Sequence, residues 1–211
     1  GAPFFLLMGR MFSLFAGDNV EQVAFWVNML SVLSAAFTVL FLFWSITHLA
    51  KKMLVKAGDV LNTGQTIAVM GAGLVGGLVC TFSDSIWFSA VEAEVYAMSS
   101  FFTAFVFWAI LKWETINDES DHNKWLILIA YMMGLSIGVH LLNLVTIPAL
   151  GLIVYFKYVE KITPKGVFLT LLTSGAIIIA VLIGVIPGIP STVGAMEVFF
   201  VNSMGFPFGS G

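Results

Sequence analysis

The chain has 211 residues, of which 59% are hydrophobic and 10% charged, and its formal net charge at pH 7 is −3. Soluble globular domains are about 45–50% apolar and about 25% charged, so this composition excludes a water-soluble domain, a disordered chain and a nucleic-acid-binding protein with a basic face. The single cysteine, Cys80, excludes an internal disulfide and a cysteine cluster for a metal. The composition predicts a polytopic membrane protein.

The first segment, residues 1–20, is too short and too irregular to span a membrane. Read as a helix, it repeats Gly9, Ser13 and Gly17 every four residues beside Arg10, and bulky apolar side chains cover the remaining surface. We expect an extracytoplasmic helix of about 14 residues, roughly 21 Å long, that lies in the membrane interface. Two interpretations of Arg10 remain open: a cation that snorkels to the interface, or a contact to a lipid phosphate.

Six apolar stretches within residues 21–187 form a predicted membrane domain, because each is long enough to cross about 30 Å of hydrocarbon or to pair as half of a short hairpin. The predicted spans are 22–48, 64–82, 93–112, 125–141, 144–158 and 166–187. The first is long and is expected to tilt or to extend beyond the membrane. The fourth and fifth are short, and we interpret them as a hairpin broken near Asn143, with Pro148 just inside the returning helix.

The basic residues support this hairpin and predict the orientation. With six spans and an external N-terminus, all eight lysines fall on one side of the membrane and Arg10 falls on the other. A single span over 125–158 would split the basic residues five to four. Because Lys and Arg are enriched in cytoplasmic loops, the hairpin is favoured, with the N-terminus and residues 83–92, 141–145 and 188–211 extracytoplasmic. The last of these segments is expected to be a loop.

Both ends of the sequence suggest a longer protein. No signal peptide precedes the first span, yet the N-terminus is expected outside, so another span would have to carry it across. The sequence also ends in an external segment that has no basic anchor. We therefore expect the chain to continue beyond both ends.

Three carboxylates lie among aromatic side chains between the second and third spans: Asp84, Glu92 and Glu94. Glu94 stands at the mouth of the third span, where a carboxylate usually faces a polar cavity or a partner and can act as a general acid or base. The alternative for both glutamates is that they cap the helix and favour its N-terminal dipole. On one helix they would point to different sides, so only one would face a shared site. Asp84 is either a loop residue or the N-cap of a short surface helix.

His140 ends the fourth span and Asn143 lies in the following turn, again on the side predicted to be external. If the helix persists, their spacing lets both face one cavity, where the imidazole could donate to a phosphate or a sugar hydroxyl. The alternative is a helix-end histidine bonded to main-chain carbonyls. His48 and His122 are expected on the cytoplasmic side, in structural or solvated positions.

Two GxxxG pairs, Gly73–Gly77 and Gly134–Gly138, predict close packing between helices. The sequence contains no zinc-protease HExxH, no nucleophile elbow and no phosphate-cradling glycine loop. It also lacks the internal repeat that marks many transporters.

Four stretches carry a resemblance to a known family: GAPFFLLMGRMFSLF, AVEAEVYAMSSFFTAFVFWAILKWE, GLSIGVHLLNLVTIPAL and FFVNSMGFPFGSG. The chain resembles, over essentially its whole length, a bacterial family of polytopic membrane proteins of formerly unknown function. That family is related to the eukaryotic transmembrane protein O-mannosyltransferase and belongs to the C-type glycosyltransferase superfamily. The resemblance implies an all-α membrane helix bundle in the bacterial inner membrane, with catalysis at its outer face.

The resemblance also implies the reactants. The donor would be a polyprenyl-phosphate sugar, mannose-like, and the acceptor a Ser or Thr hydroxyl of an exported protein. In relatives, HPP usually precedes the GAP and an acidic stretch lies further upstream, so the main catalytic carboxylate is expected upstream of Gly1. Within this sequence the resemblance and the external clustering favour Glu94 as a sugar or acceptor contact and Arg10 or His140 near the phosphate. Further candidates are Asp84, Glu92 and Asn143.

Two other functions remain open. A transporter or flippase of a lipid-linked substrate would need polar groups near the membrane midplane, where this sequence has almost none. A non-catalytic membrane subunit would pack against partners through the GxxxG faces. The expected partners are membrane lipid, the polyprenyl-phosphate sugar and the exported acceptor protein, with no nucleic acid. No resident cofactor is predicted, and no ligand spacing demands a divalent metal.

Overall fold

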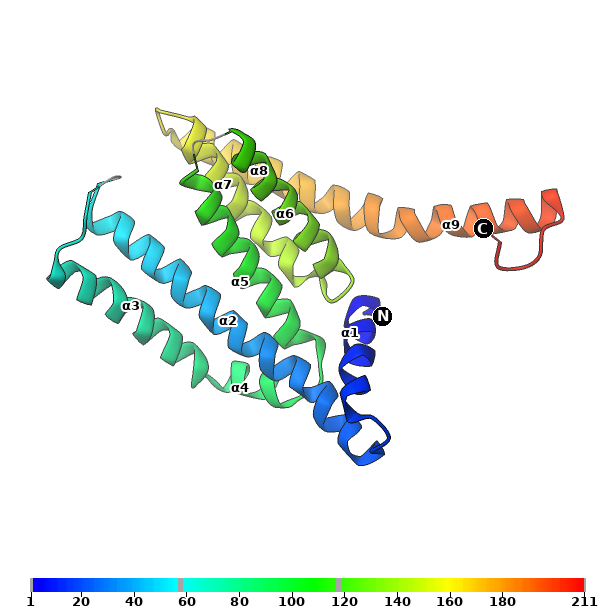
Figure 1. Cartoon of the computed structure of the whole chain (residues 1–211). Coiled ribbons are helices and arrows are strands. Elements are labelled where there is room, and N and C mark those ends of the chain that lie inside the picture. The colour runs from blue at the N-terminus through cyan, green and yellow to red at the C-terminus, as the bar shows by residue number, and fades with distance from the viewer. Residues whose placement is uncertain (1, 57–58, 117–118, 211) are drawn as a thin grey trace.

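The computed structural model describes residues 2–56, 59–116 and 119–210, and over these residues the chain is a helix bundle without a β-strand (Figure 1). This confirms the predicted all-α class. The α-helices are α1 Pro3–Ser13, α2 Val23–Leu54, α3 Thr63–Thr81, α4 Asp84–Val91, α5 Val95–Glu114, α6 Glu119–Ile137, α7 Ile147–Tyr158, α8 Pro164–Ala180 and α9 Ile186–Met204. Short 3₁₀ or π segments join some of them: η1 Leu14–Ala16, η2 Val20–Gln22, η3 Leu141–Thr146 and η4 Val181–Val185.

Five segments of the described chain are long and apolar enough to cross a membrane. They are Val20–Leu54, Thr63–Thr81, Val95–Glu114, Leu141–Tyr158 and Pro164–Met204. The chain is therefore an integral membrane protein. The remaining predicted span corresponds to α6, which has 19 residues but carries charged side chains in its first two turns, Asp121 and Lys124 among them.

The predicted hairpin between the fourth and fifth spans is confirmed. Helix α6 ends at Ile137, and the 3₁₀ segment η3 leads into α7. The hydroxyl of Tyr158, at the end of α7, lies 3.3 Å from Nε2 of His122, near the start of α6. The two helices therefore run in opposite directions, and the chain returns to the end of the bundle from which α6 began.

Helices α2 and α5 form the centre of the bundle, with α3 packed on α2 and with α6 and α7 packed on α5 (Figure 1). The surface of α2 includes small polar residues that are buried. Two of them satisfy their hydroxyls within the helix: Ser34 donates to the carbonyl of Leu30 at 2.7 Å, and Thr38 donates to the carbonyl of Ser34 at 2.8 Å. Small side chains that make such internal bonds allow close helix contact in a membrane without unpaired hydroxyls.

The first GxxxG pair packs as predicted. A Cβ on Gly73 would lie 2.5 Å from a methyl group of Thr47 and 2.9 Å from the ring of Phe43, both on α2. Gly77 is also buried against α2, but a Cβ there would lie 3.6 Å from a methyl group of Val39, which is an ordinary van der Waals contact. Gly73 is therefore the member of the pair at which a larger side chain would disturb the contact between α3 and α2.

The second GxxxG pair, Gly134–Gly138, does not pack against a helix through both glycines, as the sequence had predicted. A Cβ on Gly134 would meet nothing within 4 Å. At Gly138 a Cβ would lie 2.9 Å from Cβ of Phe4, because the start of α1 crosses the turn after α6. A glycine is therefore needed at position 138 because α1 passes close to it. The contact does not involve Gly134 and is not a GxxxG contact between two helices.

The C-terminal part of the chain corrects one prediction. We expected a loop over 188–211, but α8 continues through the π segment η4 into α9, and helical structure extends to Met204. Proline removes a main-chain donor, and a π turn is one way in which a helix accommodates such a residue. Pro187 lies in the first turn of α9, just after η4, and Pro190 lies inside α9, yet the helix continues past both of them. Figure 1 shows α9 projecting away from the bundle.

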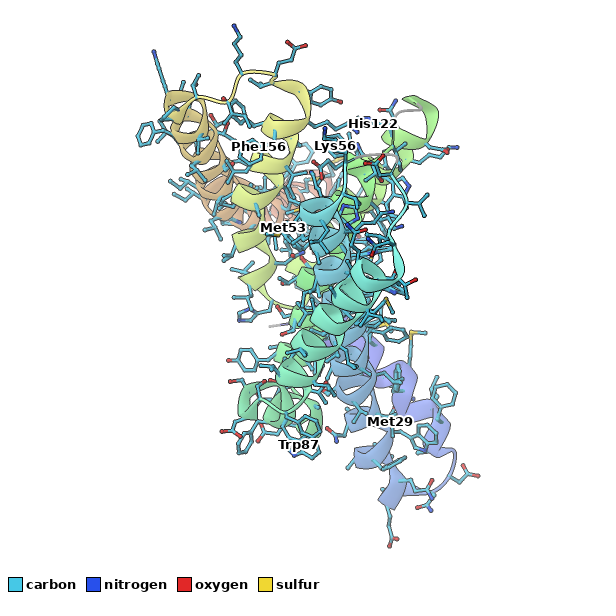
Figure 2. All side chains as sticks on the ribbon, turned by 90° about the vertical axis from the view of Figure 1, so that its left-hand side faces the viewer. Met29, Met53, Lys56, Trp87, His122 and Phe156 are labelled. Atoms are coloured by element: carbon cyan, nitrogen blue, oxygen red, sulfur yellow. The ribbon has the colours of Figure 1, made fainter. Side chains whose placement is uncertain are left out.

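The bundle has two chemically different ends (Figure 2). Trp87 of α4 and Met29 of α2 lie at one end, which we call the carboxylate end because it holds α4, the start of α5 and the turn after α6. Lys56 and His122 lie at the opposite end, which we call the lysine end. The eight lysines all belong to the segments that meet there: the ends of α2, α5 and α7, and the starts of α6 and α8.

Candidate functional site

Glu94 is the N-cap residue of α5, with an extended backbone that brings the chain into the helix. Its side chain is exposed and makes no capping hydrogen bond. Glu92 is also exposed, but it is the C-cap residue of α4. The two glutamates therefore lie between two helices and not on one, and the carboxylate of Glu94 is available to a ligand.

His140 has an extended backbone and begins the 3₁₀ segment η3. Its Nδ1 atom accepts a hydrogen bond from the main-chain N–H of Leu142 at 3.1 Å. In a neutral imidazole the proton then resides on Nε2, which leaves that nitrogen as a donor. His140 is therefore bonded to a main-chain N–H and not to carbonyls, and it retains a donor that could reach a phosphate or a hydroxyl.

An aromatic contact brings the starts of α5 and η3 together. The rings of Tyr96 and His140 lie 5.6 Å apart between centroids. Tyr96 is in the first turn of α5, two residues after Glu94, so the carboxylate and the imidazole belong to neighbouring segments at the carboxylate end. The sequence analysis did not assign a role to Tyr96, although its position beside Glu94 was a usable signal.

The start of α1 joins these two segments. The main-chain N–H of Phe4 donates to the carbonyl of Gly138 at 2.8 Å. Beneath this bond, Phe5 of α1, Met98 and Phe102 of α5, and Val139 of the turn form one buried apolar cluster. We call the group formed by the exposed Glu94 and Tyr96 and the partly exposed His140, whose segments meet next to this cluster, the helix-start site.

Asn143 does not share a cavity with His140. Because α6 ends at Ile137, the helical spacing on which that expectation depended is lost. The Asn143 side chain is fully buried and donates from Nδ2 to Oγ of Ser136 at 2.9 Å. Thr146 in turn donates to the main-chain carbonyl of Asn143 at 2.6 Å. In this structure Asn143 fixes the turn that carries His140.

Arg10 and Asp84 lie apart from the helix-start site. Arg10 is in the last turn of α1, is exposed, and donates from Nη1 to Oγ of Ser13 at 3.2 Å. Asp84 is the first residue of α4, a short surface helix whose N-cap residue is Ser83. Asp84 is therefore neither a loop residue nor the N-cap, as the two sequence interpretations had it, but the residue after the N-cap, where a carboxylate favours the helix dipole.

No cation forms an ion pair with Asp84, Glu92 or Glu94 within the described chain. The ion pairs of the described residues are Lys52–Glu114 and Lys124–Asp121, and both lie at the lysine end. In the same residues, no group of three or more His, Cys, Asp or Glu side chains could hold a metal ion. The chemistry that Glu94 and His140 offer directly is hydrogen bonding to hydroxyl groups and to an anion.

An all-α bundle of membrane-spanning helices, with an exposed carboxylate and an imidazole at one end, defines a polytopic membrane protein with a polar site at the end of its bundle. A comparison with protein families adds the family itself. The model of the Protein O-mannosyl-transferase TMEM260 N-terminal domain matches residues 1–163, well over half of the chain, and the chain therefore belongs to this family.

This result confirms the predicted relation to the eukaryotic protein O-mannosyltransferase over residues 1–163. The matched residues end just before α8, so they comprise α1 to α7 and include the helix-start site. No match was found among curated proteins or among solved structures.

Proposed function

We propose that the chain is the membrane core of a protein O-mannosyltransferase. It would transfer mannose from a polyprenyl-phosphate donor to a Ser or Thr hydroxyl of an exported protein, at the outer face of a bacterial inner membrane. The observation that carries this proposal is the position of the helix-start site, which joins α1, α5 and η3 within the family-matched residues. Segments far apart in the sequence thus bring the start of α5, which carries Glu94, beside the segment that carries His140.

The proposed reaction is a direct displacement at the anomeric carbon. The acceptor oxygen forms a bond to that carbon, and the bond from the carbon to the phosphate oxygen breaks. The hydroxyl proton passes to a carboxylate base, for which we propose a residue upstream of Gly1, and polyprenyl phosphate leaves as an anion. The product is a mannosylated hydroxyl, and no oxidant or reductant is required.

The residues of this chain would bind and orient the reactants. Glu94 accepts hydrogen bonds from sugar or acceptor hydroxyls, because its exposed carboxylate has no cation partner in the described residues. The Nε2–H of His140 donates to the departing phosphate, where charge develops. Arg10, Asp84 and Glu92 are secondary candidates for contacts to the reactants, because Arg10 and Asp84 lie apart from the helix-start site and Glu92 is the C-cap residue of α4. Asn143 contributes by holding the turn beneath His140.

The location at the end of the bundle suits a donor with two different parts. A polyprenyl chain stays in the bilayer, whereas the acceptor arrives from water. Helix α1 exposes large apolar side chains beside the helix-start site, Leu6 at 67% and Leu7 at 56% of their surface. Such a surface remains in lipid while the polar side chains of the site face the headgroup region.

The proposal is tested by measuring mannose transfer with the full-length protein in membranes. Radiolabelled polyprenyl-phosphate mannose is the donor, and a peptide rich in Ser and Thr is the acceptor. Glu94→Gln and His140→Gln are compared with Glu21→Gln, an exposed glutamate of η2 that belongs to no part of the proposed site. Loss of a hydrogen bond to a charged group costs about 1.5–3 kcal/mol, so we expect kcat/KM to fall roughly 10- to 100-fold in the first two variants.

Three outcomes contradict parts of the proposal. Undiminished transfer by Glu94→Gln removes the role of that residue. A wild-type protein that moves the donor across the bilayer without forming a mannosylated product supports the transporter or flippase alternative. A wild-type protein that does neither supports the non-catalytic subunit.

A further inference from the structure

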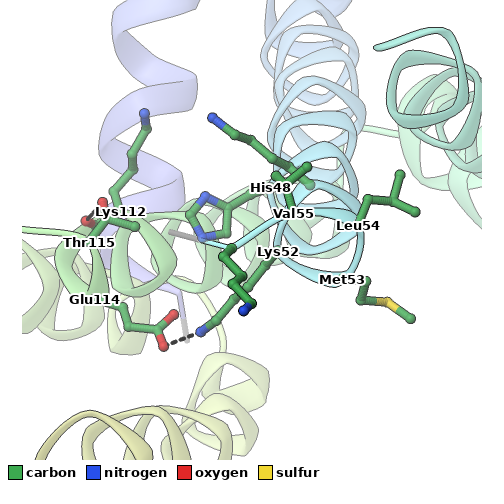
Figure 3. A pocket seen from close by; sticks show the side chains of 10 residues that line it. His48, Lys52, Met53, Leu54, Val55, Lys112, Glu114 and Thr115 are labelled. Atoms are coloured by element: carbon green, nitrogen blue, oxygen red, sulfur yellow. Dashed lines mark hydrogen bonds and ion pairs between the residues drawn. The ribbon is translucent and has the colours of Figure 1, made fainter. Parts of the chain in front are cut away.

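The lysine end contains a hollow of about 1030 Å³ between the C-terminal ends of α2 and α5 (Figure 3). The basic residues that line it are His48, Lys51, Lys52, Lys56 and Lys112. The hollow lies at the end of the bundle opposite the helix-start site, so it is independent of the proposed transfer reaction.

The charge in this hollow is unbalanced. Glu114 is the one carboxylate among the residues that line it, and its Oε1 atom already pairs with the ammonium of Lys52. Lys51, Lys56 and Lys112 are exposed, and none of them forms an ion pair within the described residues. Three positive charges therefore face one concave surface without an acidic partner there.

Helix stability alone accounts for only part of this arrangement. Lysines in the last turn of a helix interact favourably with its dipole, which explains Lys51, Lys52 and Lys112. Lys56 lies beyond the end of α2, outside the last turn, and nevertheless lines the same hollow. Two helices that are distant in sequence thus direct their cations into one space.

Apolar side chains adjoin the cations. Met53 and Leu54 also line the hollow, and 87% and 46% of their surfaces are exposed. Figure 3 shows both projecting from α2 on the side away from Glu114. A cationic hollow beside exposed apolar side chains matches a molecule that has a phosphate at one end and a hydrocarbon chain at the other.

We propose that this hollow binds a phosphate anion, supplied by the headgroup of an anionic membrane lipid or by a free phosphate compound. The lysine ammonium groups are compact point charges that attract phosphate oxygens without a fixed geometry. The carboxylate of Glu114 holds Lys52 at one wall, and the three unpaired lysines bind the ligand.

The experiment measures lipid binding by the purified protein in detergent, with native mass spectrometry as the readout. Phosphatidylglycerol and phosphatidylcholine are the two lipid probes, and inorganic phosphate is the soluble probe. The test variant is a double substitution that carries both Lys51→Gln and Lys56→Gln. Its matched control is Lys161→Gln with Lys165→Gln, which removes two exposed charges from the same end but not from the hollow. A third variant, Lys51→Arg with Lys56→Arg, keeps the charge.

We expect the wild type to retain phosphatidylglycerol in preference to phosphatidylcholine. The test variant should bind phosphatidylglycerol about tenfold or more weakly, whereas the control and the arginine variant should bind like the wild type. If the same lysine dependence is found for inorganic phosphate but not for phosphatidylglycerol, the ligand is a soluble phosphate.

Equal losses in the test variant and in the control would overturn the proposal, since binding would then follow the total charge of this end. Lysine-independent binding of both anionic probes would overturn it as well. Circular dichroism melting of each variant establishes that a loss of binding is measured on folded protein.

Discussion

Lys157 of α7 holds its ammonium 4.5 Å from the centroid of the Trp113 indole and donates a hydrogen bond to the Trp113 carbonyl at 3.0 Å. The same ammonium donates to the carbonyls of Glu114 at 3.0 Å and Ile116 at 2.8 Å. Carbonyls in the last turn of a helix lack partners within that helix. Lys157 of α7 therefore caps the C-terminal end of α5 and stabilises the packing of α7 on α5.

Replacing Lys157 by Met should destabilise the protein. The change keeps much of the side-chain volume but removes the donor from three part-buried hydrogen bonds, and a hydrogen bond to a charged group contributes about 1.5–3 kcal/mol. We expect a loss of at least 2 kcal/mol in the free energy of unfolding, measured by equilibrium denaturation in mixed micelles. Lys161→Met is the matched control, because Lys161 is exposed and should change stability by about 0.5 kcal/mol or less. Equal effects at the two positions would contradict the capping role.

Replacing a glycine of α3 by alanine should have opposite effects on stability at positions 73 and 71. Gly73→Ala places a methyl group 2.5 Å from a methyl group of Thr47, so α3 must move away from α2, at a cost of about 1–3 kcal/mol. Gly71→Ala meets nothing within 4 Å and gains helix propensity of up to about 1 kcal/mol. Thermal unfolding in detergent should show a lower Tm for the first variant and an unchanged or higher Tm for the second. If both substitutions raise Tm, α3 does not pack on α2 through Gly73.

Asn143 and Ser136 should behave as a coupled pair. Asn143→Ala removes a fully buried amide and leaves the Ser136 hydroxyl without its donor, so we expect a loss of about 1–3 kcal/mol. Ser136→Ala should cost less, and the double variant should be less destabilised than the sum of the two single variants. A double-mutant cycle of unfolding free energies measures this difference. Strict additivity would show that the hydrogen bond contributes nothing to stability.

The orientation in the membrane can be tested with introduced cysteines. Cys80 is the single cysteine, so Cys80→Ser gives a background on which Ser85→Cys or Lys161→Cys introduces one exposed thiol at either end of the bundle. Because the lysines are expected on the cytoplasmic side, a membrane-impermeant maleimide should label position 85 in intact spheroplasts and position 161 only after permeabilisation. The reverse labelling pattern would place the helix-start site in the cytoplasm and exclude an exported acceptor.

The sequence alone determined the class of protein and most of its helices. Long apolar runs can be placed without knowledge of packing, because each span must satisfy its own main-chain hydrogen bonds inside a membrane. The segregation of lysines also predicted the hairpin around Asn143, since the alternative would have split the charges between the two sides. The helix through η4 into α9 was missed, because Pro187 and Pro190 are typical of a break, whereas in the structure the helix continues past both of them after a π segment.

The tertiary structure decided which side chains meet. From the sequence, His140 and Asn143 were both candidates for the site, with His140 favoured, and we expected them to face one cavity. In the structure His140 contacts Tyr96, whereas Asn143 is buried against Ser136. Two features decide whether such a residue faces a ligand or fixes a turn. One is the residue at which the preceding helix ends, and the other is the segment that packs on the turn, which here is the start of α1 at Gly138. Likewise, the positions of the lysines in the sequence predicted the orientation of the chain in the membrane. Only the packing of α2 against α5 brings four of them around one hollow. Contacts between distant segments arise from packing, which no local pattern of residues specifies.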